Sequence, residues 1–348
     1  MNLFELTRKL IDIPSVTGDE KRIGEFLAAH LGNLGYSVQM QEVEKDRFNV
    51  VARTDAPPRV VFSTHMDTVP PDISSSEDEE RIHGRGSCDA KGIIAAQIVA
   101  AERLLEEGMR DVGLLFTVDE EMGSRGAQVA NMNKPEHPPQ FLINGEPTDN
   151  KLATATKGSL RLTLKAIGRP AHSAYPEHGE SAIENLLEIL ADIRRCEWPK
   201  HGSLGETTCN IGVISGGTRP NVIAAEASAE LQVRLVGKAR PVKSILEAAI
   251  NGRAEVHYLS EHEPVHLMPV AGFARCVVRF TTDIPYLSDW GTPLLLGPGS
   301  ILNAHTDHEF IEKRELSEAV DLYVRLARAL FAREDKQRLS EATEGALQ

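Results

Sequence analysis

The chain lacks the features that would place it in several common classes of protein. Its 348 residues contain four cysteines, none in a Cys-x-x-Cys pair, which excludes a thiolate zinc ribbon and argues against a disulfide framework. No apolar run approaches the roughly 20 residues that a membrane helix needs, so we expect no membrane partner. Basic residues are also scarce: 38 Lys and Arg face 51 Asp and Glu, a net charge of -13. Because such a chain repels polyphosphate, nucleic acid is not an expected partner, and solubility accounts for most of the carboxylates.

The amino-terminal segment has the pattern of a surface helix. Leu3, Leu6, Leu10 and Ile11 recur at helical spacing, with acidic and basic residues between them. A signal peptide has instead a basic start and a continuous apolar core. We therefore expect a cytoplasmic protein.

The first 150 residues alternate between strand and helix patterns. Apolar periods of 3.6 residues predict helices over 19–34 and 93–105. Short buried strands are predicted between and after them, at 49–52, 60–62, 112–118 and 141–143. Strands separated by helices of this length predict an α/β fold, a mostly parallel sheet with helices on both faces.

The middle of the chain has a different pattern from the segments on either side of it. Residues 157–260 give strands that alternate apolar and polar side chains, in the order β-α-β-β-α-β, which is the ferredoxin-like split motif. The α/β character returns with an apolar strand at 292–296 and a helix at 316–331. We therefore expect a discontinuous domain, 1–156 and 261–348, interrupted by a ferredoxin-like α+β domain at 157–260.

Side chains suited to metal binding follow the predicted strands, where α/β sheets place their sites. His65 comes just past one strand, and Asp67 can hold its second ring nitrogen. Asp89 lies among glycines before a helix. A phosphate-binding loop is the alternative there, but neither GxGxxG nor GxxxxGK[ST] is present.

Three further segments add acids and histidines. Asp119-Glu120-Glu121 ends a strand, and three adjacent acids repel one another unless a cation or a proton neutralises them. Glu146 follows another strand. Either His305 or His308 can supply a last ligand, and a solvated loop is the alternative for each segment taken alone. Together they match two divalent metals that share one carboxylate.

The motifs STHMDTVP, GRGSCDAKG, DEEMGS, NGEPT and GPGSILNAHTDHE, in this order, resemble the M20 metallopeptidase and deacylase family. The resemblance covers nearly the whole chain. It implies a zinc-dependent exopeptidase-like catalytic domain interrupted by a lid and dimerisation domain.

Carried over by motif, the resemblance assigns a role to each candidate. Asp89 would bridge two metals, His65 and Glu146 would complete one site, and Glu121 and His305 the other. Glu120 would be the general base, and Asp67 would orient His65. His305 matches the family's terminal histidine because an acid, Glu309, follows four residues later, so His308 is a neighbour only.

The resemblance also implies three residues of the lid. His172 in GRPAHS would reach the active site of a partner subunit, and Asn221 and Arg234 would hold the substrate's carboxylate. Asp289 stands where the family has a Ser/Thr-Asp pair, although the adjacent Trp290 is unusual there. A homodimer formed through the lid follows from this resemblance.

The expected function is that of a dinuclear metal-dependent amidohydrolase acting on a small N-acyl amino acid, because GPGS and AHTDHE resemble acetylornithine deacetylases most. The metals would be Zn²⁺, with Co²⁺ or Mn²⁺ as alternatives. Two other functions stay open: an exopeptidase or dipeptidase with the same metals, and a metal-free non-catalytic relative. The presence of every expected ligand and of Glu120 argues against the last.

Overall fold

The computed structural model describes the backbone of residues 1–345 and the side chains of residues 1–333. The chain divides into two units. The first comprises Met1–Thr154, Leu267–Cys276 and the described residues from Thr282 onward, and the second comprises Ala155–His266 and Val277–Thr281. The boundary that the sequence suggested at residue 260 falls inside strand β14 (Glu255–His262).

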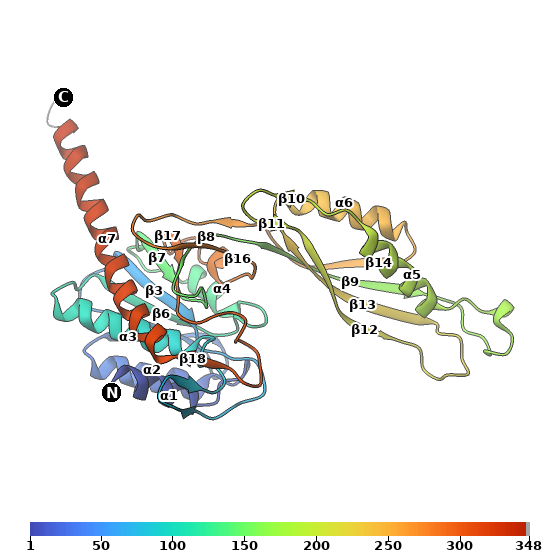
Figure 1. Ribbon diagram of the computed structural model, residues 1–348, viewed down its shortest axis with the longest axis horizontal. Coiled ribbons are helices and arrows are strands. Elements are labelled where there is room, and N and C mark those ends of the chain that lie inside the picture. Colours follow the sequence, from blue (N-terminus) through green and yellow to red (C-terminus); the bar gives the residue numbers. More distant parts are fainter. Residues whose placement is uncertain (346–348) are drawn as a thin grey trace. The chain divides into compact units, whose positions relative to one another are not determined.

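A six-stranded mixed sheet forms the centre of the first unit (Figure 1), in the order β1-β2-β6-β3-β7-β17. Strands β6, β3, β7 and β17 run parallel to their neighbours in that series, whereas β2 is antiparallel to β6 and β1 to β2. The α/β fold expected from the sequence is confirmed, with an antiparallel hairpin at one edge. The strands span Ser37–Glu44 (β1), Arg47–Arg53 (β2), Val60–His65 (β3), Val112–Thr117 (β6), Phe141–Asn144 (β7) and Thr292–Leu295 (β17).

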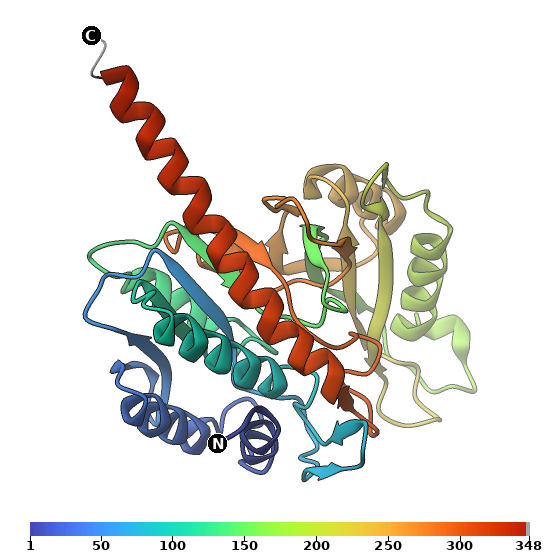
Figure 2. The same cartoon turned by 60° about the vertical axis from the view of Figure 1, so that its left-hand side comes forward.

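Both faces of this sheet are covered because successive side chains in a strand point to opposite faces. Phe62 and Phe116 belong to a large core with the helices α1, α2, α3 and α7. Val61 and Leu115 belong to a smaller core with α4 and the 3₁₀ turn η2. Figure 2 shows α3 and α7 crossing one face of the sheet. The helices span Leu3–Ile11 (α1), Lys21–Asn33 (α2), Lys91–Glu106 (α3), Arg125–Met132 (α4), Ile284–Tyr286 (η2) and Lys313–Gly345 (α7).

The structure also contains short strands that the sequence pattern did not predict. They have two to five residues each, too few for a period-2 pattern to stand out. One small sheet joins β18, β5 and β4, and another joins β15, β8 and β16. The spans are Ser76–Glu77 (β4), Arg81–His83 (β5), Leu152–Thr156 (β8), Lys200–His201 (β10), Gly205–Glu206 (β11), Val265–His266 (β15), Arg275–Val278 (β16) and Phe310–Glu312 (β18).

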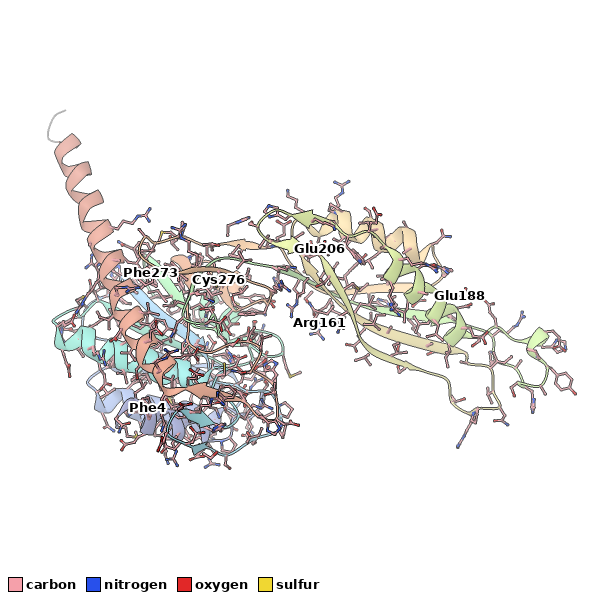
Figure 3. The ribbon with its side chains drawn as sticks, viewed as in Figure 1. Phe4, Arg161, Glu188, Glu206, Phe273 and Cys276 are labelled. Carbon is pink, nitrogen blue, oxygen red and sulfur yellow. The ribbon has the colours of Figure 1, made fainter. Side chains whose placement is uncertain are left out.

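The second unit is built on a four-stranded antiparallel sheet in the order β12-β13-β9-β14. Leu160, Leu162 and Leu164 of β9 pack against α5 and α6, whereas Arg161 lies on the opposite face. Figure 3 labels Arg161 on β9 and Glu188 on α5. The elements follow the predicted β-α-β-β-α-β order: Gly158–Ile167 (β9), Ala182–Arg195 (α5), Thr208–Gly216 (β12), Glu226–Leu235 (β13), Ala239–Ile250 (α6) and Glu255–His262 (β14), with a 3₁₀ turn at Pro176–His178 (η1).

Among the described residues, no helix combines the length and the apolar character that crossing a membrane requires.

Candidate metal centre

The candidate ligands gather at one edge of the central sheet. His65 is the last residue of β3, and Glu120 and Glu121 follow the end of β6 by a few residues. Glu146 follows β7, and the loop after β17 carries His305. Because β3, β6, β7 and β17 are parallel, their carboxyl ends meet at the same edge, where open α/β sheets hold their ligands.

Asp89 lies between two imidazoles. Its Oδ1 atom is 3.0 Å from Nε2 of His65, and its Oδ2 atom is 3.4 Å from Nε2 of His305. The same nitrogen of His305 is 2.9 Å from Oε1 of Glu121. Each oxygen of the Asp89 carboxylate therefore faces a different imidazole, the arrangement that a bridging carboxylate needs.

These contacts change how readily the two histidines hold a proton. Hydrogen bonds to Asp89 and Glu121 raise the pKa of His305 to about 10. Burial alone would lower the pKa of His65, but its hydrogen bonds to Asp67 and Asp89 raise it well above 6.5. The surrounding carboxylates thus favour a positive charge at both imidazoles. A divalent cation bound there would supply that charge in place of a proton.

Asp67 orients both His65 and the acidic turn. Nδ1 of His65 lies 2.9 Å from the carbonyl oxygen of Asp67 and 3.5 Å from its carboxylate. That carboxylate also accepts hydrogen bonds from Thr17 Oγ1 and from the backbone N–H groups of Glu120 and Glu121. Outer partners of this kind fix the orientation of a ligating imidazole.

Glu309 fixes the loop that carries Asp89. Its Oε1 atom accepts hydrogen bonds from the backbone N–H groups of Gly86, Cys88 and Asp89, at 3.0 to 3.1 Å. Its Oε2 atom accepts one from Arg85 at 2.6 Å. The side chain of Glu309 is fully buried, so the carboxylate is committed to this loop and is not a ligand candidate.

Two other glutamates are in a strongly anionic environment. Burial, followed by the charge of Glu146, raises the pKa of Glu120 well above 4.5. Burial likewise raises the pKa of Glu146, with Asp89 and Glu121 acting in the same direction. The Oε1 atom of Glu146 is buried and has no hydrogen-bond partner among the described residues. A buried carboxylate oxygen without a partner is costly, and a cation would satisfy it.

Sequence reasoning missed Asp283. It is buried, accepts a hydrogen bond from Thr117 Oγ1 at 2.7 Å, and is close enough to Glu120 and Glu146 to raise the pKa of both carboxyl groups. Burial raises the pKa of Asp283 itself to about 6. The signal was present in the pair Thr282-Asp283, which precedes a Pro-containing turn.

The pair Ser288-Asp289, which the sequence suggested instead, lies outside the centre. Trp290 is buried and packs with the smaller core near α4, and its Nε1 atom donates to the carbonyl oxygen of Ala130. Asp289 is then at the surface, where its carboxylate pairs with Lys134 at 2.8 Å. Burial of the tryptophan ring thus decides which Thr/Ser-Asp pair faces inward.

The donor set suits a divalent cation. His65, Asp89 and Glu121 each offer one atom, and these three atoms lie within 4.8 Å of one another. Imidazole and carboxylate without thiolate are ligands for zinc and also for manganese or cobalt. Glu146 and His305 add one further donor each at the same edge of the sheet.

The other candidates belong to the second unit. His172 is exposed, and its Nδ1 atom accepts a hydrogen bond from the backbone N–H of Ala174 at 3.1 Å. Asn221 is exposed in the loop between β12 and β13. Arg234 on β13 is half-buried and donates to Thr281 Oγ1. The metal candidates, Glu120 and Asp67 therefore belong to the first unit, and these three residues belong to the second.

The sequence profile of peptidase family M20/M25/M40 matches residues 61–329. The chain belongs to this family. A peptidase M20 domain-containing protein of Schizosaccharomyces pombe is 37% identical over 336 residues, which cover 93% of this chain and 84% of that one. A probable carboxypeptidase of Aspergillus terreus is 38% identical over 368 residues, 92% of this chain and 85% of that one.

Solved structures of M20 relatives share the fold. A tripeptidase of Staphylococcus aureus is 21% identical with a TM-score of 0.77, and the similarity covers 92% of this chain and 96% of that chain. A metallo-carboxypeptidase of Sulfolobus solfataricus is 17% identical with a TM-score of 0.75, covering 93% and 98%. The family and its fold are thus established for this chain, which is a hydrolase of the M20 peptidase family.

The raised pKa of Asp283 predicts a pH-dependent effect of Asp283→Asn in the metal-free protein. Because the folded-state pKa of about 6 exceeds the ordinary value of 3.8, ionisation of Asp283 destabilises the fold as pH rises between these values. Asparagine keeps the acceptor for Thr117 but carries no charge. We expect the variant to gain up to about 3 kcal/mol in unfolding free energy above pH 6 and nothing below about pH 4.

Urea unfolding of chelator-treated protein across this pH range measures the effect. Asp289→Asn is the matched control, since that exposed carboxylate should change stability by less than about 0.5 kcal/mol at any pH. A gain that is the same at pH 4 and pH 7 would contradict the account.

Proposed function

We propose that the chain is a two-metal exopeptidase that hydrolyses the amide bond next to the free carboxylate of a short peptide. The observation that carries the proposal is the Asp89 carboxylate, with one oxygen facing His65 and the other facing His305. Relatives named as probable carboxypeptidases, 35 to 38% identical, support the choice of substrate.

In this proposal the ligands divide into two sets that share Asp89. His65 and Glu146 would hold one cation, and Glu121 and His305 the other. When bound, such cations polarise a carbonyl oxygen and lower the pKa of a water molecule from about 15.7 toward 7. The chain's own contribution is to fix these side chains: Asp67 holds His65, and Glu309 holds the Asp89 loop.

Glu120 has the properties of a proton carrier. Its backbone N–H donates to the Asp67 carboxylate at 3.1 Å, and burial raises the pKa of its carboxyl group well above 4.5. A general base works best when its pKa lies near the working pH. Glu120 would take a proton at its carboxylate from the attacking water and deliver it to the leaving amine.

The second unit would supply recognition. Arg234 is suited to the substrate carboxylate because a guanidinium binds a carboxylate through two parallel hydrogen bonds, and Asn221 would add a further contact. Nδ1 of His172 accepts a hydrogen bond, which leaves the ring proton on Nε2. From a partner subunit, that N–H would stabilise the oxyanion of the transition state.

Deacylation of N-acyl amino acids is the second candidate. An N-acyl amino acid presents the same amide bond beside the same free carboxylate, so both substrates fit one set of contacts. The strings at 297–300 and 304–309, which resemble acetylornithine deacetylases, favour it. A metal-free relative would have lost ligands, and this chain keeps them all.

Hydrolysis of a substrate panel by the Zn²⁺-loaded protein tests the proposal. The panel contains dipeptides and tripeptides with free or amidated carboxyl ends, N-acetylornithine and simple N-acetyl amino acids. We expect turnover of peptides with a free carboxyl end and a loss of at least about 100-fold in Glu120→Ala. Asp321→Ala, which removes an exposed carboxylate on α7, is the control. Turnover of N-acyl amino acids alone would support the second candidate, and turnover of amidated peptides alone would contradict both.

We further propose that the chain forms a homodimer through strand β12. This edge strand has no charged residue, and Val213 and Ile214 are each 53% exposed on it. The opposite edge strand, β14, carries Glu255 and Glu261, and charged residues protect an edge from pairing. A twofold axis would pair β12 with its copy, as an isologous interface requires.

Sedimentation velocity tests the dimer. Ile214→Glu should convert the protein to a monomer, because a carboxylate placed at the paired edge meets its own copy across the axis. Leu259→Glu, on the opposite edge strand and 55% exposed, should leave the sedimentation coefficient unchanged. A monomeric wild-type protein at micromolar concentration, or equal effects of the two substitutions, would contradict the interface.

A further inference from the structure

A buried ion cluster lies behind the acidic turn that carries Glu120. Arg47 opens β2, and its Nε and Nη2 atoms bind both carboxylate oxygens of Glu20 at 2.8 and 2.7 Å. Nη2 also donates to Asp119 Oδ1 at 2.8 Å, and Nη1 donates to Glu44 at 3.1 Å. The side chain of Arg47 is 12% exposed and that of Glu20 is 0% exposed. One guanidinium thus binds three carboxylates from three segments of the chain.

Asp119 shapes the turn that follows it. Its φ angle is 71°, a left-handed conformation that costs a non-glycine residue energy unless its surroundings hold it. Its carbonyl oxygen accepts hydrogen bonds from Gly123 and Ser124, and its carboxylate accepts one from the backbone of Arg125. Residues 119–124 therefore close as a loop around Asp119, with Glu120 and Glu121 between its ends.

The same turn is held from the opposite side by Asp67. The Asp67 carboxylate accepts the N–H groups of Glu120 and Glu121 at 3.1 and 3.2 Å. Arg47 binds the first acid of the run, and Asp67 binds the backbone of the other two. Three adjacent acids would otherwise repel one another. The Arg47 guanidinium holds the Asp119 side chain away from the metal centre, and Glu120 and Glu121 are left facing that centre.

We infer that Arg47 is a positioning residue for Glu120 and Glu121, acting through Asp119. The inference rests on the proposed function for the roles of those two glutamates. The Arg47 guanidinium is planar and is fixed by two hydrogen bonds to Glu20, which lies on the N-terminal side of α2. From that position the same group reaches Asp119. A lysine cannot hold both carboxylates in this geometry.

Arg47→Lys tests the inference against a matched control, Arg59→Lys. Arg59 also binds a carboxylate, Asp111, and is partly buried, but it lies at the amino-terminal end of β3, whereas the acidic turn follows the carboxyl end of the parallel strand β6. We expect Arg47→Lys to weaken Co²⁺ binding about 10-fold and to change its visible absorption spectrum, because Glu121 shifts. The kcat should fall about 10- to 100-fold, with KM within about 3-fold of wild type. Arg59→Lys should lose a similar amount of thermal stability without any of these changes.

Asp119→Asn is the second variant, in case Arg47→Lys fails to fold. Asparagine tolerates a positive φ angle, so the substitution removes the ion pair and keeps the turn's backbone. It should reproduce the change in the Co²⁺ spectrum and the loss of kcat.

The outcomes separate the two claims. Wild-type Co²⁺ affinity, spectrum and kcat in both Arg47→Lys and Asp119→Asn would overturn the positioning role and leave a structural ion pair. A weakened, spectrally altered Co²⁺ site in a protein that hydrolyses nothing in the panel would support the positioning role and contradict the proposed function.

Discussion

Carboxylates buried together at one edge of a sheet are the constraint on which the rest of the structure depends. Glu146 lies within electrostatic reach of Asp89, Glu120 and Asp283, and burial raises the pKa of Glu120, Glu146 and Asp283. Such a group stays ionised only when positive charge neutralises it. Two imidazoles supply part of that charge. Divalent cations would supply the remainder, and the orphaned Oε1 atom of Glu146 is an atom that they would satisfy.

The surrounding structure keeps this unfavourable cluster in place. Parallel strands bring four chain segments to one edge, but strand ends alone leave their loops free to move. The loop that carries Asp89 and the acidic turn each have buried anchors. Glu309 binds three N–H groups of the Asp89 loop, Asp67 binds two of the acidic turn, and Arg47 binds that turn from behind. The anchors are themselves charged groups whose partners are fully assigned, so they rigidify the site at little cost in unsatisfied polar atoms.

Much of this could be predicted from the sequence. The period of apolar residues predicted most of the helices and buried strands, although not β1 or α4. The ligand candidates were found because they follow an apolar strand or, for Asp89, precede a helix. The short strands β4, β5, β8 and β18 were not predicted because so few residues show no clear alternation of apolar and polar side chains. Asp283 was not found because only the packing of the fold decides which acid points inward, Asp283 beside Thr282 or Asp289 beside Trp290. The anchor formed by Arg47 joins residues 20, 47 and 119, a contact that no local pattern encodes.

The central claim is that this edge of the sheet holds two cations that share Asp89. Calorimetric titration of the metal-free protein with Zn²⁺ tests it most directly. We predict two ions bound per chain in the wild-type protein. In Asp89→Asn the bridging oxygen pair is lost, so at least one ion should no longer bind and the other should bind at least about 10-fold more weakly. Binding of no ion by the wild-type protein, or unchanged binding of two ions by Asp89→Asn, would contradict the account.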